Sequence, residues 1–298
     1  MKDFCGLISI VGRPNVGKST LLNRLIEQKV SITSRKSQTT RNNILGIKTK
    51  DNHQMVFIDT PGVHINASKV MNKVLNQSAL GAIEDADLII FMLQRNKINT
   101  LDELILERLK GVETKKICVI NKLDQVASIN SLLPVVEKLR SENDFAEIIP
   151  VSAKTGKNIN ELENMICQNL PENNHLYDSE TKFLAKESFM ISEIIREKII
   201  RFLGEELPHE TYVQLQKLED KENIINIDAE IIVARESQKG IVVGKNGAKL
   251  KKIGEKARID LEKFFNKKVF LKTWVKTKKN WNNDSDFISS LGIGSLYD

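Results

Sequence analysis

The stretch Gly12-Arg13-Pro14-Asn15-Val16-Gly17-Lys18-Ser19 decides the fold of the first half of this chain. It matches Gly-x4-Gly-Lys-Ser, the pattern of a P-loop, whose backbone N–H groups surround phosphates. The apolar run 7–11 predicts a buried strand that enters the loop, and residues 20–26 predict the helix that leaves it. The amino end of that helix attracts anions. A chance glycine turn is the alternative that an isolated match leaves open.

The residues of this loop have expected roles in binding a nucleotide. Lys18 would reach the β- and γ-phosphates, and the Ser19 hydroxyl would bind Mg²⁺. The expected contacts are Gly12, Arg13, Pro14, Asn15, Val16, Gly17, Lys18, Ser19 and Thr20.

A second motif, Asp59-Thr60-Pro61-Gly62, ends an apolar strand predicted over 54–59. In P-loop enzymes an aspartate at this position holds the Mg²⁺ shell, and the glycine N–H can reach the γ-phosphate. We therefore expect all four residues to line the nucleotide site, with Ser19 and Asp59 at the metal.

Two later motifs point to a guanine base. Asn121-Lys122-Leu123-Asp124 follows an apolar run, and the Asp124 carboxylate can accept hydrogen bonds from N1–H and N2–H₂ of guanine, where adenine presents a repulsive pattern. Losing such a charge-assisted contact typically costs a few kcal/mol. Ser152-Ala153-Lys154 follows a further run and would place a backbone N–H at guanine O6. Each motif ends a predicted strand, where open α/β sheets bind ligands, so the four together predict a GTP-binding domain.

The chain of 298 residues is long enough for about two domains. Residues 1–172 alternate short strands with amphipathic helices, which predicts an α/β domain with a mostly parallel sheet. The expected strands lie near 6–11, 45–49, 54–59, 87–93, 116–121 and 147–151. Residues 173–181 are the expected linker, 182–280 a second domain, and 281–298 a tail to which the sequence assigns no role.

The second domain has a different order of elements. A helix is expected over 181–203, then an antiparallel strand pair over 212–218 and 224–233. A short helix near 237–243, a turn, a helix near 248–265 and a strand over 269–276 complete the order α-β-β-α-α-β.

This second domain is also where positive charge gathers. The chain has a net charge of +6, yet residues 239–279 hold fourteen lysines and arginines against three acids, which leaves −5 on the rest. Such a basic segment predicts a polyanionic partner, most often RNA or DNA. A solvated helix face is the alternative.

The loop Gly244-Lys245-Asn246-Gly247 refines this prediction. A Gly-x-x-Gly between two helices is how KH domains clamp a nucleic-acid backbone, with about four nucleotides in the apolar groove beside it. The element order is that of the type II (prokaryotic) KH domain, although helix-turn-helix connections also use glycine. The expected RNA contacts are Ile241, Val242, Gly244, Lys245, Asn246, Gly247, Lys249 and Lys252.

Other features narrow the class of protein. Cys5, Cys118 and Cys167 have no metal-ligand spacing, so reduced thiols are expected. The first predicted strand leaves no room for a leader, and no apolar run approaches the roughly 20 residues that span a bilayer. We expect a cytoplasmic protein, at most peripheral to a membrane.

With both halves joined, the chain resembles the Era family of bacterial GTPases over nearly its whole length. Residues 32–41 look like that family's first switch loop, in which Thr40 is the expected ligand of Mg²⁺ and γ-phosphate, with Thr39 as the second choice. The resemblance implies GTP/GDP and Mg²⁺ as cofactors, binding to the 3′ end of 16S (small-subunit) rRNA, and a role in assembly of the 30S subunit. It also implies a loose association with the inner membrane; a monomer is the default.

The expected catalytic residues are Lys18, Thr40, Gly62 and Asn15. Val63 stands where Ras-type enzymes have a water-orienting glutamine, so slow hydrolysis is expected. In related GTPases an asparagine at the position of Asn15 holds K⁺ near the phosphates; Arg35 and Arg41 are the competing candidates. Equal rates of GTP hydrolysis in Na⁺ and in K⁺ would argue against a role for K⁺ at Asn15.

The combination predicts a nucleotide-controlled RNA clamp, in which GTP orders loops at 31–43 and 62–75 and thereby moves the KH domain. Three alternatives stay open. An RNA-modifying GTPase would need further catalytic domains, a binding module would use GTP only structurally, and a membrane-associated regulatory GTPase would use the basic domain on anionic lipid.

Overall fold

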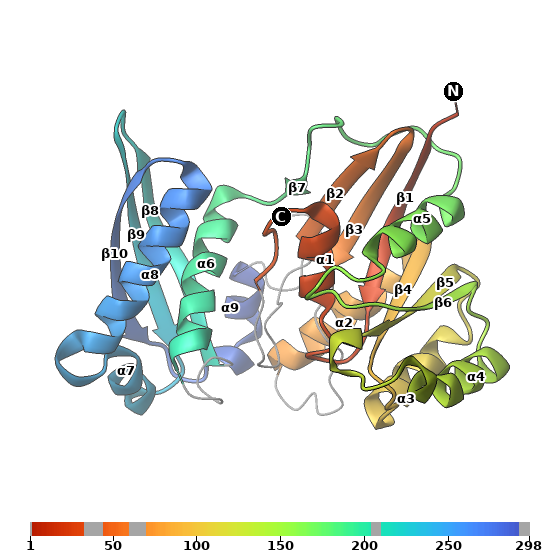
Figure 1. Ribbon diagram of the computed structural model, residues 1–298. Helices are drawn as coiled ribbons and strands as arrows, with labels where there is room; N and C mark the ends of the chain where they lie inside the picture. Colours follow the sequence, from red (N-terminus) through yellow and green to blue (C-terminus); the bar gives the residue numbers. More distant parts are fainter. Residues whose placement is uncertain (1, 33–43, 60–69, 204–209, 292–298) are drawn as a thin grey trace.

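The computed structural model describes residues 2–32, 44–59, 70–203 and 210–291, which form two regions (Figure 1). The first is built on a seven-stranded sheet with the order β6-β5-β4-β1-β3-β2-β7. Its strands are β1 (Phe4–Val11), β2 (Ile44–Lys50), β3 (His53–Asp59), β4 (Leu88–Gln94), β5 (Lys115–Asn121), β6 (Glu147–Pro150) and β7 (Phe183–Leu184). β1, β3, β4, β5 and β6 are parallel, and β2 is antiparallel to β3. The predicted strands and mostly parallel sheet are confirmed.

Helices cover both faces of this sheet. α1 (Lys18–Ile26) and α5 (Ile159–Asn169) pack on one face through a core that includes Ile8, Phe57 and Ile90. On the other face, a second core joins the strands to α2 (Val70–Glu84), α3 (Thr100–Leu109) and α4 (Leu133–Glu142). Because the parallel strands are buried on both sides, they carry near-continuous apolar runs instead of an alternating pattern.

The segment just after the predicted linker contributes a strand to this sheet, which the sequence did not predict. Phe183 and Leu184, expected in the first turn of a helix, form β7 and pair antiparallel with Leu45 and Gly46 of β2. The Phe183 ring packs against the first region's core, so its apolar character reflects that contact and not a helix face. The helix α6 therefore begins at Glu187 and ends at Phe202.

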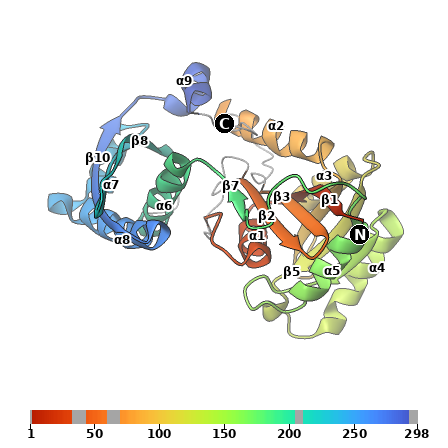
Figure 2. The ribbon, with the colours of Figure 1, turned by 90° about the horizontal axis from the view of Figure 1, so that it is seen from above.

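The second region has the predicted order α-β-β-α-α-β. After α6 come β8 (Thr211–Asp220), β9 (Ile224–Val233), α7 (Glu236–Val243), α8 (Ala248–Phe265) and β10 (Lys268–Thr277). β9 pairs antiparallel with β8 and parallel with β10. The helices pack on one face of this sheet through alternate residues such as Ile227, Ile231 and Val275. In Figure 2, α6 lies between the sheet and the first region.

The tail packs against both regions. Trp281, in the short 3₁₀ helix Trp281–Asn283, is fully buried, and its indole N–H donates to the Glu210 carbonyl at 3.0 Å. It shares an apolar cluster with Met71 and Leu75 of α2, and with Ile288 of α9 (Ser285–Ser290). Trp281 therefore serves core packing, and the tail has a structural role.

Cys5, Cys118 and Cys167 are free, and burial raises the pKa of each thiol. Across residues 2–32, 44–59, 70–203 and 210–291, no helix has the length and apolar character needed to cross a membrane.

Candidate functional site: a phosphate-binding loop and a glycine-rich basic loop

The P-loop joins β1 to α1 and depends on two glycines. Gly12 has φ +154°, and a Cβ there would lie 2.7 Å from the Met92 carbonyl oxygen. Gly17 has φ +109°, and a Cβ there would overlap the Asn121 amide. The loop therefore passes too close to β4 and β5 for any side chain at these positions.

Lys18 is buried at the start of α1 and its ammonium group turns back into the loop. Its Nζ donates to the Gly12 carbonyl at 2.9 Å and to the Arg13 carbonyl at 3.3 Å. Burial lowers the pKa of Lys18 to about 8, against the opposing effect of the nearby Asp59 carboxylate. A phosphate anion at the loop would supply the negative charge that restores its ordinary pKa.

Three oxygen-bearing side chains meet where a divalent cation is expected. The Ser19 hydroxyl donates to Asp59 Oδ2 at 3.0 Å, and the Ser31 hydroxyl donates to the same oxygen at 2.7 Å. Asp59 is fully buried at the end of β3. Carboxylate and hydroxyl oxygens are the ligands that Mg²⁺ accepts, so Ser19 and Asp59 fit the predicted metal site.

The two base-recognition motifs lie side by side at the ends of β5 and β6. The Asn121 side chain donates to the Val16 carbonyl at 2.7 Å and accepts from the Ala153 N–H at 3.0 Å. The Ser152 hydroxyl donates to Asp124 Oδ1 at 2.6 Å, which fixes the carboxylate. The described residues of the four motifs, with Asp59 representing the second, therefore meet at the carboxyl edge of the sheet.

Further contacts brace the rim of the loop. Lys122 Nζ donates to the Asn15 carbonyl at 2.8 Å, and Asn15 itself has a left-handed φ of 67°. Arg24 donates to the Ala153 and Lys154 carbonyls at 3.2 and 2.7 Å. These bonds hold the base-recognition loops against α1 and the P-loop.

Asp102 is a site residue that sequence reasoning missed. It is fully buried in α3, where Oδ2 accepts a hydrogen bond from Arg13 Nε at 3.0 Å. Burial raises the pKa of this carboxyl, and Arg13 counteracts that shift. The pattern Asn99-x-x-Asp102 forms a helix capping box, which is a local sequence signal. Its contact with a loop 89 positions away has no such signal.

Several predicted residues lie outside the described part of the chain. They are Thr40 with its alternative Thr39, Thr60, Pro61 and Gly62, Val63, and the two candidates Arg35 and Arg41.

The basic loop of the second region has the geometry that Gly-x-x-Gly requires. Gly244 and Gly247 have φ values of 70° and 76°, and Asn246 is left-handed at 49°. A Cβ on Gly244 would lie 2.8 Å from Lys249 Cγ. Lys245, Asn246 and Lys249 are exposed, so the loop presents two cations to solvent.

One predicted groove residue is placed differently. Ile241 is 43% exposed beside the loop, but Val242 is fully buried in the core of the second region. The expectation that Val242 forms the apolar floor for RNA is wrong, because neighbouring positions of α7 point in different directions. Lys252 Nζ lies 5.1 Å from the centroid of the Phe202 ring on α6.

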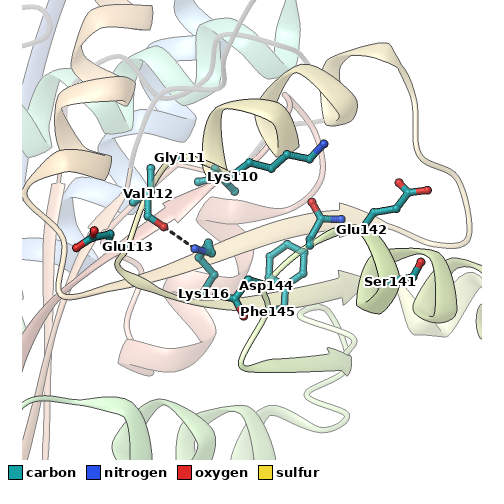
Figure 3. Close-up of a pocket in the computed structure, with 11 residues that line it drawn as sticks. Lys110, Gly111, Val112, Glu113, Lys116, Ser141, Glu142, Asp144 and Phe145 are labelled. Carbon is teal, nitrogen blue, oxygen red and sulfur yellow. Dashed lines mark hydrogen bonds between the residues drawn. The ribbon is translucent and has the colours of Figure 1, made fainter.

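A separate cavity of about 670 Å³ lies at the opposite end of β5 (Figure 3). It is bounded by the carboxyl ends of α3 and α4, with Phe145 and Lys116 in its wall. Lys116 Nζ donates to the Val112 carbonyl at 2.6 Å. No predicted site residue lines it.

Family models match both regions. Residues 7–122 match the 50S ribosome-binding GTPase family, and residues 206–282 match the KH domain. The chain is 46% identical over 290 residues to GTPase Era of Coxiella burnetii, covering 97% of this chain and 98% of the relative. It is 45% identical over 292 residues to GTPase Era of Haemophilus influenzae, covering 98% and 97%.

Solved structures agree over the whole length. The crystal structure of Era with MgGDPNP and nucleotides 1506–1542 of 16S ribosomal RNA has a TM-score of 0.95 at 35% identity, covering 99% of this chain and 100% of that one. A variant of Aquifex aeolicus Era bound to GDP and aluminium fluoride has a TM-score of 0.94 at 35% identity, with the same coverage.

Fold and site thus define a P-loop GTPase joined to a KH domain. Within that class, the near-complete match to curated relatives and the two domain models are decisive. The chain belongs to the Era family of GTPases.

The buried state of Lys18 predicts proton uptake on nucleotide binding. Its pKa of about 8 in the free protein must rise beside phosphates, so affinity should fall as pH rises through about 8. Titration calorimetry with GDP at pH 8, in two buffers of different ionisation enthalpy, should show uptake of about half a proton. Lys18→Arg, whose guanidinium stays charged, should abolish that uptake; equal uptake in both proteins would contradict the assignment.

Proposed function

We propose that this protein is a GTP-switched binder of the 3′ end of 16S rRNA that acts in assembly and maturation of the 30S subunit. The observation that carries the proposal is the joining of an assembled guanine-nucleotide site to a KH domain with an intact Gly-x-x-Gly loop. A structural relative that matches the whole chain was solved with MgGDPNP and a 16S rRNA fragment, which supports the same partner here. A ribosomal partner implies a cytoplasmic protein.

In this proposal the nucleotide site works by positioning and charge. Lys18 and the loop N–H groups hold the phosphates, and Ser19 and Asp59, with Thr40, hold Mg²⁺, which would offset the charge of the phosphates. Gly62 contacts the γ-phosphate, and Asn121, Asp124 and the Ser152–Lys154 segment read the guanine. Hydrolysis is slow, because Val63 cannot orient water.

The potassium hypothesis for Asn15 stays a prediction. Its backbone is held by Lys122, which leaves the side-chain amide as the group that would contact a cation beside the phosphates. Membrane association and the monomeric state also stay predictions. For the lipid alternative, anionic vesicles should compete with rRNA for the basic domain; for our proposal they should not.

Base selectivity tests the nucleotide site. Asp124→Asn replaces a carboxylate oxygen with an N–H donor, which repels the guanine amino group but suits the carbonyl oxygen that xanthine has there. GTP affinity should fall by about two orders of magnitude while XTP affinity rises. Titration of both nucleotides measures this. Ser152→Ala, which loosens the same carboxylate, should weaken GTP binding without a gain for XTP; a gain in both would contradict the assignment.

RNA binding tests the proposed function as a whole. A labelled RNA that copies the 3′ end of 16S rRNA should bind tightly with a GTP analogue and more weakly with GDP. Lys245→Asp with Asn246→Asp should weaken binding at least about tenfold, because it replaces a phosphate-binding cation with two anions. Lys115→Asp with Asn143→Asp, away from the KH domain, is the control. Equal binding by both double variants would overturn the RNA assignment.

Contacts between the two domains lie directly beside the loops that are expected to sense the nucleotide. Lys29, three residues before the predicted switch loop, reaches across to α6, where its Nζ donates to Glu197 at 2.6 Å. The Glu197 side chain is fully buried and also pairs with Lys198 and Arg201. Lys29 and Lys198 lower the pKa of Glu197 against the effect of burial. We call the Lys29–Glu197 ion pair the clasp.

Hydrogen bonds connect the clasp to the metal end of the site. The Asn23 side chain accepts from the N–H groups of Val30 and Ser31, both at 2.8 Å. The Ser31 hydroxyl in turn donates to Asp59. The segment from Lys29 to Ser31 therefore joins a proposed Mg²⁺ ligand to the KH domain within three residues.

The second contact follows the other nucleotide-sensing loop. α2, which begins eight residues after Gly62, buries Met71 and Leu75 against Trp281 and Ile288 of the tail. Tyr212 of β8 donates to the Leu291 carbonyl at 3.1 Å and so ties the tail to the KH sheet. A conformational change in either loop would therefore be transmitted to the KH domain through these contacts.

The clasp predicts how RNA affinity responds to nucleotide. Lys29→Ala should reduce the ratio of RNA affinities with GTP analogue and with GDP by at least about fivefold, the low end of typical coupling energies. Nucleotide affinity should stay the same, since Lys29 touches no predicted nucleotide contact. Glu197 keeps two other cations, so folding should survive.

The matched control is Lys50→Ala. Lys50 has similar side-chain exposure to Lys29, 43% against 47%, but pairs with Glu163 inside the GTPase domain. It should leave the affinity ratio unchanged. An unchanged ratio in Lys29→Ala would exclude the clasp from the coupling.

A further inference from the structure

The described helices α6, α7 and α8 pack on one face of the KH sheet, and the edge strand β10 places a regular pattern of side chains on the other face. Side chains of a strand alternate between faces, so the residues between the helix-facing Val269, Leu271 and Val275 point outward. We call this set the β10 face: Lys268, Phe270, Lys272, Trp274 and Lys276. It alternates lysine with aromatic residues along the whole strand.

The aromatic side chains of the β10 face are available for contact. Phe270 is 57% exposed, the largest value among the exposed large hydrophobic residues of the described chain. Trp274 is half-buried, and its indole N–H donates to Glu230 at 2.9 Å, which fixes the ring against the sheet. Lys272 Nζ lies 5.8 Å from the Trp274 ring centroid. A fixed indole and an exposed phenyl ring thus flank one lysine.

The charge on this strand is unbalanced. Among the described residues, Lys268 and Lys272 make no ion pair, although Asp228 of β9 lies opposite Lys272 in register. Lys276 reaches Glu230 at 3.7 Å, and Glu230 is already occupied by the Trp274 indole. The β10 face therefore presents, on either side of Phe270, two cations that make no ion pair within the described residues.

We propose that the β10 face is a second RNA-binding surface, on which single-stranded nucleotides stack on Phe270 and Trp274 while Lys268 and Lys272 contact the phosphates. Aromatic side chains between cations are the recurrent chemistry of single-strand binding, because every base offers a π-face. The proposal rests on the proposed function, since it extends the same RNA beyond the Gly-x-x-Gly loop.

The position of β10 makes the extension geometrically direct. α7 and α8, which carry the loop between them, both pack on β10, and Thr277 at its end donates to Glu236 of α7 at 2.6 Å. A KH groove holds about four nucleotides. A longer strand that leaves the groove needs to cross only this edge strand to reach the β10 face.

A second copy of the chain is the competing occupant. An edge strand with an exposed phenyl ring can pair with another edge. Here the lysines argue against it, because two β10 faces brought together would oppose like charges. RNA supplies the opposite charge.

The test distinguishes RNA binding by the β10 face from RNA binding by the Gly-x-x-Gly loop, because only a long RNA should reach both. Two RNAs are used, a pentanucleotide and a long single strand, both from the 16S 3′ end. Phe270→Ala with Lys272→Ser should weaken binding of the long RNA at least about fivefold, the lower end for one lost stack, and leave the pentanucleotide unchanged. Leu104→Ala in α3 with Lys110→Ser at the C-cap of that helix, both at similarly exposed positions, is the matched control.

The loop variant distinguishes the two possible failures. Lys245→Asp with Asn246→Asp should weaken both RNAs. If it weakens neither, the proposed function fails. If it weakens both while the β10 variant binds the long RNA normally, the second surface is overturned. Concentration-dependent dimerisation that the β10 variant abolishes, with no effect on RNA, would assign the face to self-association instead.

Fluorescence reports stacking directly. The chain has two tryptophans, so Trp281→Phe leaves Trp274 as the sole reporter. The long RNA should quench it and the pentanucleotide should not. If Trp281→Phe unfolds the protein, the same comparison in the unaltered chain applies, because Trp281 is fully buried and contributes a constant signal. An absence of quenching at saturating long RNA would exclude Trp274.

Discussion

The nucleotide site depends on the Asn121 side chain, which bonds the P-loop on one side and the last base-recognition loop on the other. Its two hydrogen bonds, to Val16 and from Ala153, join the ends of β1, β5 and β6. The approach is so close that position 17 tolerates no Cβ. The glycine in Gly-Lys-Ser is therefore required as much by this amide as by a phosphate. Remaining contacts, from Lys122, Arg24 and Arg13, tighten an arrangement that Asn121 establishes.

Two contacts join the domains, and they depend on different kinds of interaction. The clasp is electrostatic, with a fully buried carboxylate that stays charged because three cations surround it. The tail contact is apolar, and Trp281 fills it completely. A buried carboxylate that loses its cation is strongly destabilising, whereas apolar contacts are non-directional and persist when the packed surfaces shift. Under the proposed function, the clasp would break when the KH domain moves, and the apolar tail contact would persist and guide that movement.

The sequence predicted what local patterns encode. Strand ends with their motifs, the order of the KH elements and the Gly-x-x-Gly loop all follow from runs of a few residues. What it could not predict are pairings between distant positions. Arg13 with Asp102 and Lys29 with Glu197 join surface-type residues whose burial only the fold creates. The expectations for Phe183 and Val242 were wrong for a related reason, since apolar character does not say whether a side chain enters its own domain's core, a neighbouring core or a binding groove.

The short strand β7 has a consequence for mechanics. Phe183 and Leu184 are paired with β2 of the GTPase sheet, and α6 starts at Glu187. The linker between the sheet and α6 therefore consists of Ala185 and Lys186 alone. Two residues reach at most about 7 Å. The KH domain is therefore not a freely tethered module; it can reorient relative to the GTPase domain only by rotation about this short hinge. The backbone torsion angles of two residues determine that rotation, so the KH domain has access to a small set of orientations relative to the GTPase domain.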